Sequence, residues 1–319
     1  MPGERERVLR GLRRRVRAVS RSGRQAAVAL ALALAACAAP AVAAASAGDE
    51  GATWLGPRPP ARPRRVVSLA PSVTDLVVAM GLVDRLVGVT RFDDAPEVAR
   101  LQRVGGYLDP NAEAVVALRP DLAVWIDDDG GVAAVRKIAD LGVPVMVLHV
   151  VGVRDVIAGA RALGTALGEA AAGERVAREL SESLARARES RPGPRTRVLI
   201  VVGHDPLVVA GPGSFPDELL RLAGGENVVR DARPWSFYSV ERAVADDPAL
   251  VIDAGVHEPP ATLARLDAIP AVRRGAVRRL SDDSALRPGP RFVRAVAELA
   301  RILHPAGAVA PARAAEAAP

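Results

Sequence analysis

The sequence predicts an α/β protein in which two doubly wound α/β lobes are bridged by one long α-helix. Short apolar runs alternate with helical stretches on either side of the middle of the chain, a pattern typical of parallel sheets covered by helices. A stretch with helical apolar spacing separates these two alternating regions. A segment of the first region also recurs in the second, which indicates a duplicated unit.

The first lobe is expected over residues 65–167. Its strands are the apolar runs RRVVSLAP (64–71), LVGVT (86–90), DLAVWI (121–126) and VPVMVLH (143–149). Its helices are SVTDLVVAMG (72–81), VAAVRKIADLG (132–142) and VRDVIAGARALGTALG (153–168). We expect Ser72 to cap the first helix and Gly81 to end it, because serine and glycine are favoured at these two positions.

A bridging helix is expected over residues 168–191, followed by a second lobe over residues 192–305. About 23 residues at about 1.5 Å each would span roughly 35 Å, the width of a small domain. The second lobe contains the strands RVLIVVG (197–203), LVIDAG (250–255) and VRRLS (277–281) and the helix PRFVRAVAELARILH (290–304). The Ala/Pro-rich tail of residues 306–319 is expected to be disordered.

The positive charge of the chain is concentrated at its start. Residues 1–36 hold nine arginines and two glutamates, a balance of +7, which leaves 43 − 9 = 34 basic and 37 − 2 = 35 acidic residues in the remainder. The body is therefore close to neutral, and a nucleic-acid partner is not indicated.

The arginines precede a short apolar run and small residues, the pattern of an export signal over residues 1–36. Cys37 ends the sequence LAAC, which resembles a bacterial lipobox, so we expect an extracytoplasmic lipoprotein. The alternative is cleavage after AVAAASA (41–47), which would leave a free periplasmic protein. Residues 37–64 are expected to be a flexible tether. The single cysteine excludes an internal disulfide framework.

The repeat relates residues 107–124 to residues 235–252 at a constant offset of 128. It places Tyr107 over Trp235 and Glu113 over Glu241. We expect Asp109 to cap a helix that starts at Pro110, and Ser239 to cap its counterpart. Each glutamate then lies in a first turn, where a carboxylate interacts favourably with the helix dipole.

The aromatic side chains are expected mostly on loops or at strand ends. These are Phe92, Tyr107, Trp125, Phe215, Trp235, Phe237 and Tyr238, whereas the sheets are rich in Val, Leu, Ile and Ala. Ligands of open α/β sheets bind outside strand ends, and loop aromatics commonly serve recognition. We therefore interpret the set as a ligand surface between two lobes.

Several of these segments resemble one family. The sequences RVVSLAPSVTDLVVAMGLVDRLVGVT, DDAPE, VGGYLDPNAEAVVALRPDLAVW and AGGENVV are similar to substrate-binding proteins of ABC importers for vitamin B12, haem and ferric siderophores. The resemblance covers residues 65–304 and implies a class III periplasmic binding protein-like fold. It also implies small closure of the lobes around a ligand, and an ABC permease with its ATPase as partners.

The resemblance implies a role for individual residues. Phe92, Tyr107 and Trp235 stand at positions of cleft aromatics, and Asp283 and Arg287 at positions of polar ligand contacts. Trp125 lies one residue out of register with another cleft aromatic. Phe237 and Tyr238 lie near Trp235, and His204 at a strand end is a further expected ligand contact. Glu113 and Glu241 match the glutamates that dock on permease arginines.

The ligand is expected to be a corrinoid such as cobalamin, bound by a monomer without a cofactor of its own. The alternative is haem or a ferric siderophore, with Tyr107 as an axial ligand if the ligand is haem. An enzyme is the remaining alternative. The histidines, His149, His204, His257 and His304, form no HExxH pair, and the sequence contains neither a GxSxG elbow nor a phosphate loop. We therefore expect no catalytic residues and no resident metal.

Overall fold

The computed structural model describes residues 52–127, 132–189, 194–230, 233–256, 259 and 266–305. The predicted export signal, Cys37 and the tail of residues 306–319 lie outside this part of the chain. No helix among the described residues is long and apolar enough to cross a membrane.

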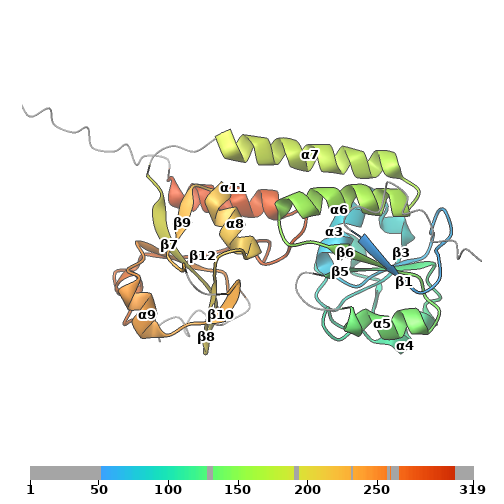
Figure 1. Ribbon diagram of the computed structural model, residues 1–319, viewed down its shortest axis with the longest axis horizontal. Coiled ribbons are helices and arrows are strands. Elements are labelled where there is room, and N and C mark those ends of the chain that lie inside the picture. Colours follow the sequence, from blue (N-terminus) through green and yellow to red (C-terminus); the bar gives the residue numbers. More distant parts are fainter. Residues whose placement is uncertain are drawn as a thin grey trace, which may run out of the picture. The chain divides into compact units, whose positions relative to one another are not determined.

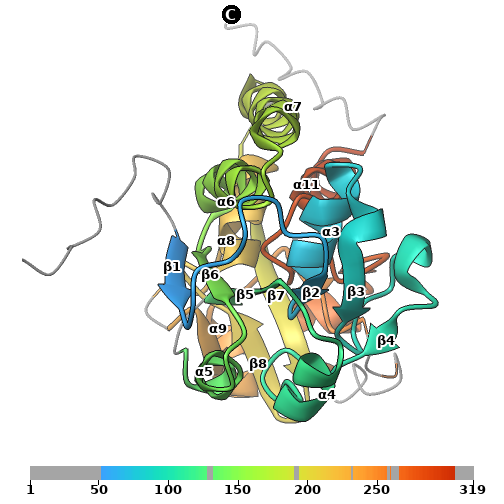
Figure 2. The same cartoon turned by 90° about the vertical axis from the view of Figure 1, so that its right-hand side faces the viewer.

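The first lobe (Figure 1) contains a six-stranded sheet in the order β1-β6-β5-β2-β3-β4, which can be followed in Figure 2. Its strands are β1 (Ala52–Leu55), β2 (Val66–Ser68), β3 (Leu86–Val89), β4 (Gln102–Arg103), β5 (Leu122–Asp127) and β6 (Val145–His149). Its helices are α3 (Pro71–Ala79), α4 (Ala112–Ala117), α5 (Ala133–Asp140) and α6 (Val153–Ala166), with short 3-10 turns at Val83–Arg85 and Pro96–Val98. All strand pairs are parallel except β1 with β6, as expected for a doubly wound unit.

Strand β1 corrects one expectation. Residues 37–64 were expected to be a flexible tether, but Ala52–Leu55 pair antiparallel with β6 along its length. Trp54 packs against the main apolar core, and Thr53 Oγ1 lies 2.7 Å from His149 Nε2. The sequence did not indicate this strand because it is only four residues long, is flanked by Gly and Pro residues and forms by pairing with the distant strand β6.

The start of α3 is a second correction. The helix begins at Pro71 with Ala70 as its N-cap, so Ser72 lies inside the first turn instead of capping it. Proline is favoured at the first helical position because its missing N–H has no partner there. The predicted end is confirmed: Gly81 follows the helix with φ of 77°, and the backbone N–H of Leu82 donates to Val77 O at 3.0 Å.

The long helix is α7 (Ala170–Glu189), which packs along α6 in both ribbon views (Figures 1 and 2). The two helices approach closely at a pair of glycines. A Cβ on Gly164 would lie 2.6 Å from the Cα of Gly173, and a Cβ on Gly173 would lie 2.7 Å from Ala160 O. Glycine at both positions therefore permits this close packing.

The second lobe contains a sheet in the order β10-β8-β7-β11-β12, with β9 also pairing with β7. Its elements are β7 (Thr196–His204), β8 (Leu207–Ala210), α8 (Phe215–Leu222), β9 (Gly225–Asn227), β10 (Trp235–Phe237), α9 (Val240–Ala245), β11 (Leu250–Asp253), α10 (Pro270–Arg273), β12 (Val277–Arg279) and α11 (Phe292–Leu303). Unlike the expected parallel sheet, this one is mixed, because β8 pairs antiparallel with both of its neighbours, β7 and β10. Only Asp205 and Pro206 separate β7 from β8, too few residues for the helical crossover that parallel strands require.

The structure preserves the internal repeat. Helices α4 and α9 are related by the offset of 128 at both ends. Their N-caps are also equivalent: Asn111 accepts a hydrogen bond from Ala114 N at 3.0 Å, and Ser239 accepts one from Arg242 N at 3.2 Å. The N-cap of α4 is therefore Asn111, and the prediction of Asp109 as its cap is wrong.

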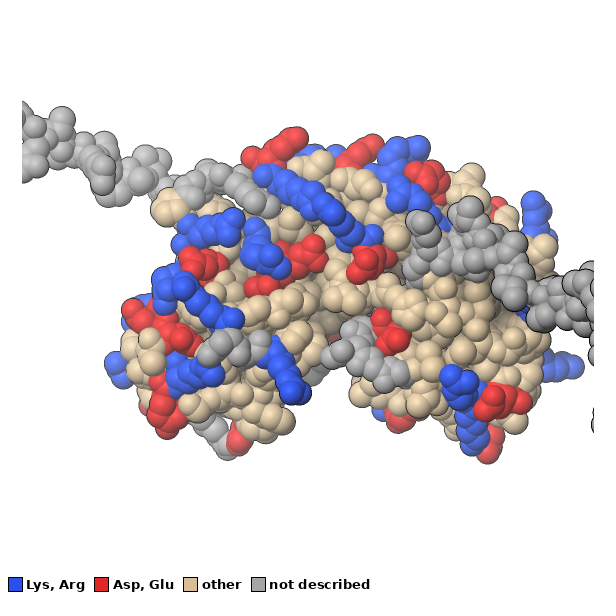
Figure 3. All heavy atoms as spheres, in the orientation of Figure 1, with Lys and Arg blue, Asp and Glu red and all other residues tan. Residues whose placement is uncertain are grey.

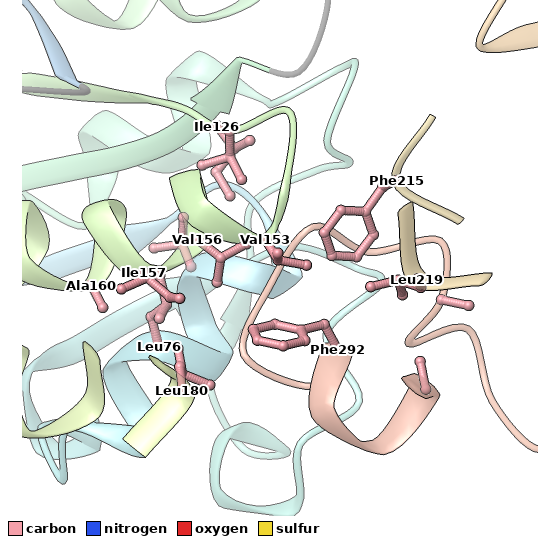
Figure 4. Packing of buried hydrophobic residues seen from close by; sticks show 14 of the residues in the cluster. Leu76, Ile126, Val153, Val156, Ile157, Ala160, Leu180, Phe215, Leu219 and Phe292 are labelled. Atoms are coloured by element: carbon pink, nitrogen blue, oxygen red, sulfur yellow. The ribbon is translucent and has the colours of Figure 1, made fainter. Parts of the chain in front are cut away.

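The two lobes share one apolar core. It includes Val153 of α6 together with Phe215 of α8 and Phe292 of α11, and Figure 4 shows these side chains pointing toward one another. Glu218 of α8 reinforces the junction, because its Oε2 accepts a hydrogen bond from Val153 N at 3.0 Å at the start of α6. The predicted fold class, two α/β lobes joined by one long helix, is confirmed.

Candidate functional site

A cavity of about 570 Å³ lies outside the carboxyl ends of β3 and β5. Its lining residues come from the start of α3, the loops that follow β3 and β4, the end of β5 and the segment before α11. They are Ala70, Pro71, Ser72, Arg91, Phe92, Asp93, Asp94, Tyr107, Leu108, Asp109, Ile126, Asp283, Leu286, Arg287 and Pro288. The volume is typical of a small-molecule site, and the position is where open α/β sheets bind ligands.

The loop that carries Tyr107 needs both of its glycines. Gly105 has φ of 104°, and a Cβ there would lie 2.6 Å from Asn111 N. A Cβ on Gly106 would lie 2.3 Å from Asp109 Oδ1 and 2.7 Å from Arg91 Cζ. The two glycines therefore allow a tight loop whose tip projects Tyr107 and Leu108 into the cavity.

Tyr107 lines the cavity and is held by contacts with β5. The hydroxyl donates to Ile126 O at 3.0 Å, and the ring stacks on Trp125 with centroids 5.5 Å apart. Trp125 is only 3% exposed and donates from Nε1 to Tyr107 O at 3.2 Å. Trp125, expected to contact ligand, instead lies in β5 behind Tyr107 and fixes its position.

A charged pair stands at the edge of the cavity next to Phe92. Both terminal nitrogens of Arg91 donate to Asp109, with Nη1 to Oδ2 at 3.0 Å and Nη2 to Oδ1 at 2.9 Å. The guanidinium carbon also lies 4.8 Å from the centroid of the Phe92 ring. The hydrogen bonds from Arg91 hold the pKa of the Asp109 carboxyl below its ordinary value.

A further wall of the cavity belongs to residues 281–291, which we call the crossing segment because it joins β12 to α11 of the second lobe and contacts the first lobe on the way. Arg287 lies 2.6 Å from Asp283 Oδ2 and 3.1 Å from Asp94 Oδ1, and it donates to Phe92 O at 3.2 Å. Its side chain is 14% exposed. Asp283 and Arg287, both expected at the ligand site, therefore line the cavity, with Arg287 occupied by protein partners.

Behind this wall, Arg291 joins two acids of the first lobe. Its Nη2 lies 2.7 Å from Asp75 Oδ1 and 2.8 Å from Asp94 Oδ1. Burial raises the pKa of Asp75 to about 6, although Arg291 acts in the opposite direction. Among the described residues, the second oxygen of this buried carboxylate has no hydrogen-bond partner. The two carboxylates raise the pKa of Arg291, which stays charged, although its burial acts in the opposite direction.

The expected aromatics of the second lobe divide into two groups. Trp235 and Phe237 are exposed on the edge strand β10, by 42% and 79%, on the same face of the strand, and neither lines the described cavity. Tyr238 does not belong to a ligand surface: it is buried in the core of the second sheet, where its hydroxyl donates to Asp246. Phe215, expected on a loop, is buried at the start of α8.

The expectation for His204 is wrong. The residue ends β7, but its side chain is buried and its Nε2 lies 2.9 Å from Asp253 Oδ1. The pair lies within the second lobe and lines none of the described cavities. His257 lies outside the described residues. The described chain contains no group of His, Cys, Asp or Glu side chains suited to hold a metal ion.

Glu113 and Glu241 lie in the first turns of the equivalent helices α4 and α9, one in each lobe, and both are exposed. Neither lines the cavity.

Sequence reasoning missed Arg91, Asp94 and Asp109 as members of the site. Arg91 and Asp94 flank the predicted Phe92 in RFDDAP, and Asp109 was assigned to a helix cap. Arg91 and Asp109 are opposite charges on the loops after the neighbouring strands β3 and β4, which could have indicated an ion pair. Their contact depends, however, on the backbone of the Gly105–Gly106 turn, which the sequence pattern does not reveal.

Two lobes around one shared core, with an aromatic and charged cavity at strand ends, define a binding protein for a small molecule. The chain belongs to the periplasmic binding protein family, whose model matches residues 66–283. Within it, the chain fits the group that serves ABC importers of metal chelates.

Two relatives and one solved structure illustrate the similarity. The chain is 27% identical to the vitamin B12-binding protein of Pectobacterium carotovorum subsp. carotovorum (strain PC1) over 248 residues, 75% of this chain and 88% of that one. It is 27% identical to an uncharacterized ABC transporter substrate-binding lipoprotein, YvrC, of Bacillus subtilis (strain 168), over 76% of this chain and 81% of that one. The apo structure of the periplasmic heme-binding protein RhuT from Roseiflexus sp. RS-1 is similar with a TM-score of 0.69 and 26% identity, over 75% of this chain and 97% of that one.

Proposed function

We propose that this protein binds a corrinoid in the cavity and delivers it unchanged to an ABC permease. The observation that carries the choice of ligand is the combination of a cavity walled by Phe92, Tyr107 and Leu108 with a charge balance that is not positive. Flat apolar side chains suit a macrocycle, and the charges decide which macrocycle.

The charge balance favours a neutral ligand. The lining holds Arg91 and Arg287 against Asp93, Asp94, Asp109 and Asp283, so its formal charge is 2 − 4 = −2. Arg291, bonded to Asp94 from behind, and the N-terminus of α3, worth about half a charge, reduce this excess but do not reverse it. Haem carries two propionates, whereas the side chains of the corrin ring are amides, so the described lining suits a corrinoid better.

The orientation of Tyr107 supports the same choice. An axial tyrosine must offer its oxygen to iron. Here the hydroxyl is held by Ile126 O, and the ring is held by Trp125. Tyr107 thus offers the cavity a flat face, which suits stacking on a macrocycle.

The remaining parts of the proposal concern delivery. We propose that Glu113 and Glu241 dock the two lobes on basic side chains of the permease, because each acid is exposed at the same position of an equivalent helix. We also propose export by residues 1–36 and acylation of Cys37, which would hold a monomeric receptor at the outer face of the cytoplasmic membrane. YvrC, described as a lipoprotein, supports this anchoring.

Isothermal titration calorimetry tests the ligand. The purified protein is titrated with cyanocobalamin, with haemin and with a ferric hydroxamate siderophore under the same conditions. We expect saturable binding of cyanocobalamin, weakened about fivefold or more by Tyr107→Ala, since stacking on a ring is worth about 1 kcal/mol. Saturable binding of haemin or the siderophore without binding of cyanocobalamin would reject the proposal.

A further inference from the structure

The most exposed ion pair that lines the cavity joins Arg91 and Asp109. Asp94, another half-exposed acid of the lining, is bonded to Arg287 and Arg291. The side chains of Arg91 and Asp109 are 49% and 64% exposed, yet they lie in the cavity lining beside Phe92 and Tyr107. Arg287 and Asp283, in the crossing segment, are only 14% and 12% exposed. Of the described ion pairs that line this cavity, Arg91 with Asp109 is therefore the most accessible to a ligand.

The pair is held in a fixed arrangement. Asp109 takes both terminal nitrogens of Arg91, and the Phe92 ring lies under the guanidinium. The Cβ that would separate them is absent at Gly106, and Arg91 N donates to Gly105 O at 2.8 Å. The loops after β3 and β4 thus present one donor group and one acceptor group side by side at the cavity.

This arrangement matches one functional group. A carboxamide needs a donor for its oxygen and an acceptor for its N–H groups, and an arginine next to a carboxylate supplies both. A carboxylate on the ligand has no proton for Asp109 and is repelled by it, whereas an amide can donate to Asp109 while its oxygen accepts from an N–H group of Arg91 that does not face Asp109.

We infer that Arg91 and Asp109 form a carboxamide-recognition subsite that selects ligands with amide side chains and rejects those with carboxylates at the same position. This inference rests on the proposed function. It goes beyond the class of ligand by naming the side-chain amides of the corrinoid as the groups that are recognised. Asp109 is the specificity-determining member, because its charge excludes an acid.

The test compares cyanocobalamin with the monocarboxylic acids made by hydrolysing one of its side-chain amides. Each compound is titrated by calorimetry at neutral pH into the wild type, Asp109→Asn and Glu113→Gln. Glu113 is an exposed acid of the same lobe outside the cavity, so its variant is a control for charge at a distance. Asp109→Ser is a second uncharged variant, and the melting temperature shows which variants keep the fold.

We expect the wild type and Glu113→Gln to bind cyanocobalamin about tenfold or more tightly than at least one of the acids. Without the charge of Asp109, we expect this preference to fall to within about twofold, mainly through tighter binding of the acid. Equal binding of amide and acids by the wild type would overturn the inference, as would an unchanged preference in a folded Asp109 variant. In both cases binding of cyanocobalamin itself would stand. Absence of cyanocobalamin binding by the wild type would instead reject the proposed function.

Discussion

At the scale of single residues, the most unusual environment is that of Asp75 in α3. The carboxyl is buried with one oxygen bonded to Arg291, and the other oxygen has no hydrogen-bond partner in the part of the chain that the structure describes. Arg287 and Asp94 are the other charged groups that act on it. Burial outweighs the attraction of the two arginines and raises the pKa of Asp75 to about 6, from an ordinary value of 3.8.

This pKa predicts how stability depends on pH. As pH falls, the carboxyl of Asp75 takes up a proton near pH 6 in the folded state but only near pH 4 in the unfolded chain. Protonation therefore favours the folded state, and the contribution of Asp75 to the free energy of unfolding rises as pH falls through 6. Between pH 7.5 and pH 5 we expect this group to add about 1 kcal/mol to the free energy of unfolding. In Asp75→Asn that increment should be missing, as measured by urea unfolding at both pH values. Asp84→Asn, an exposed aspartate of the same lobe, is the control and should keep the increment. An equal pH dependence of Asp75→Asn and wild type would contradict the assignment.

At the scale of elements, the repeat predicted that α4 and α9 are equivalent helices, one in each lobe. Their boundaries, caps and following left-handed residues correspond at the offset of 128, with φ of 46° at Arg119 and 42° at Asp247. The cap of α4 was assigned to the wrong residue for a local reason. Asp109 is engaged by Arg91, and Pro110 forms a β-bridge with Gly105, so the helix starts only after Asn111.

The equivalence of α4 and α9 carries the prediction for docking. Reversing both charges, in Glu113→Lys with Glu241→Lys, should reduce uptake of labelled ligand in a transport assay at least about tenfold, because like charges would then face each other at the permease. Ligand affinity of the purified double variant should stay within about twofold of wild type, since neither side chain lines the cavity. Glu97→Lys with Glu226→Lys, one acid of each lobe outside these two helices, is a matched control. Normal uptake by the first double variant would exclude docking through these helices.

At the scale of the whole molecule, the alternation of strands and helices was enough to predict both lobes and the helix between them. The resemblance placed Asp283 and Arg287 of the crossing segment at the ligand site, but the contacts of this segment with the first lobe were not predictable. SDDSALRPGPR has no periodicity, and its partners Asp75 and Asp94 are about 200 residues away in the sequence. A Cβ on Gly289 would lie 2.7 Å from Ser72 Cβ, so this contact requires a glycine that no local pattern explains. Burial of Trp125 and His204 depends in the same way on packing between distant elements.

The shared core predicts how the molecule responds to loss of one ring. Phe292→Ala removes a buried side chain between the lobes and should lower the free energy of unfolding by about 3 to 5 kcal/mol. Phe237→Ala removes the same atoms from an exposed position and should change it by less than about 0.5 kcal/mol. Scanning calorimetry of the wild type should show a single unfolding transition, because the lobes share this core. Two separate transitions, or an equal loss of unfolding free energy in Phe292→Ala and Phe237→Ala, would contradict a common core.

That core also has a consequence for each lobe taken alone. Phe215 and Phe292 of the second lobe pack with Val153 of the first, so separating the lobes would expose apolar side chains of both to water. A fragment that holds a single lobe should therefore aggregate, although each lobe has a complete sheet of its own.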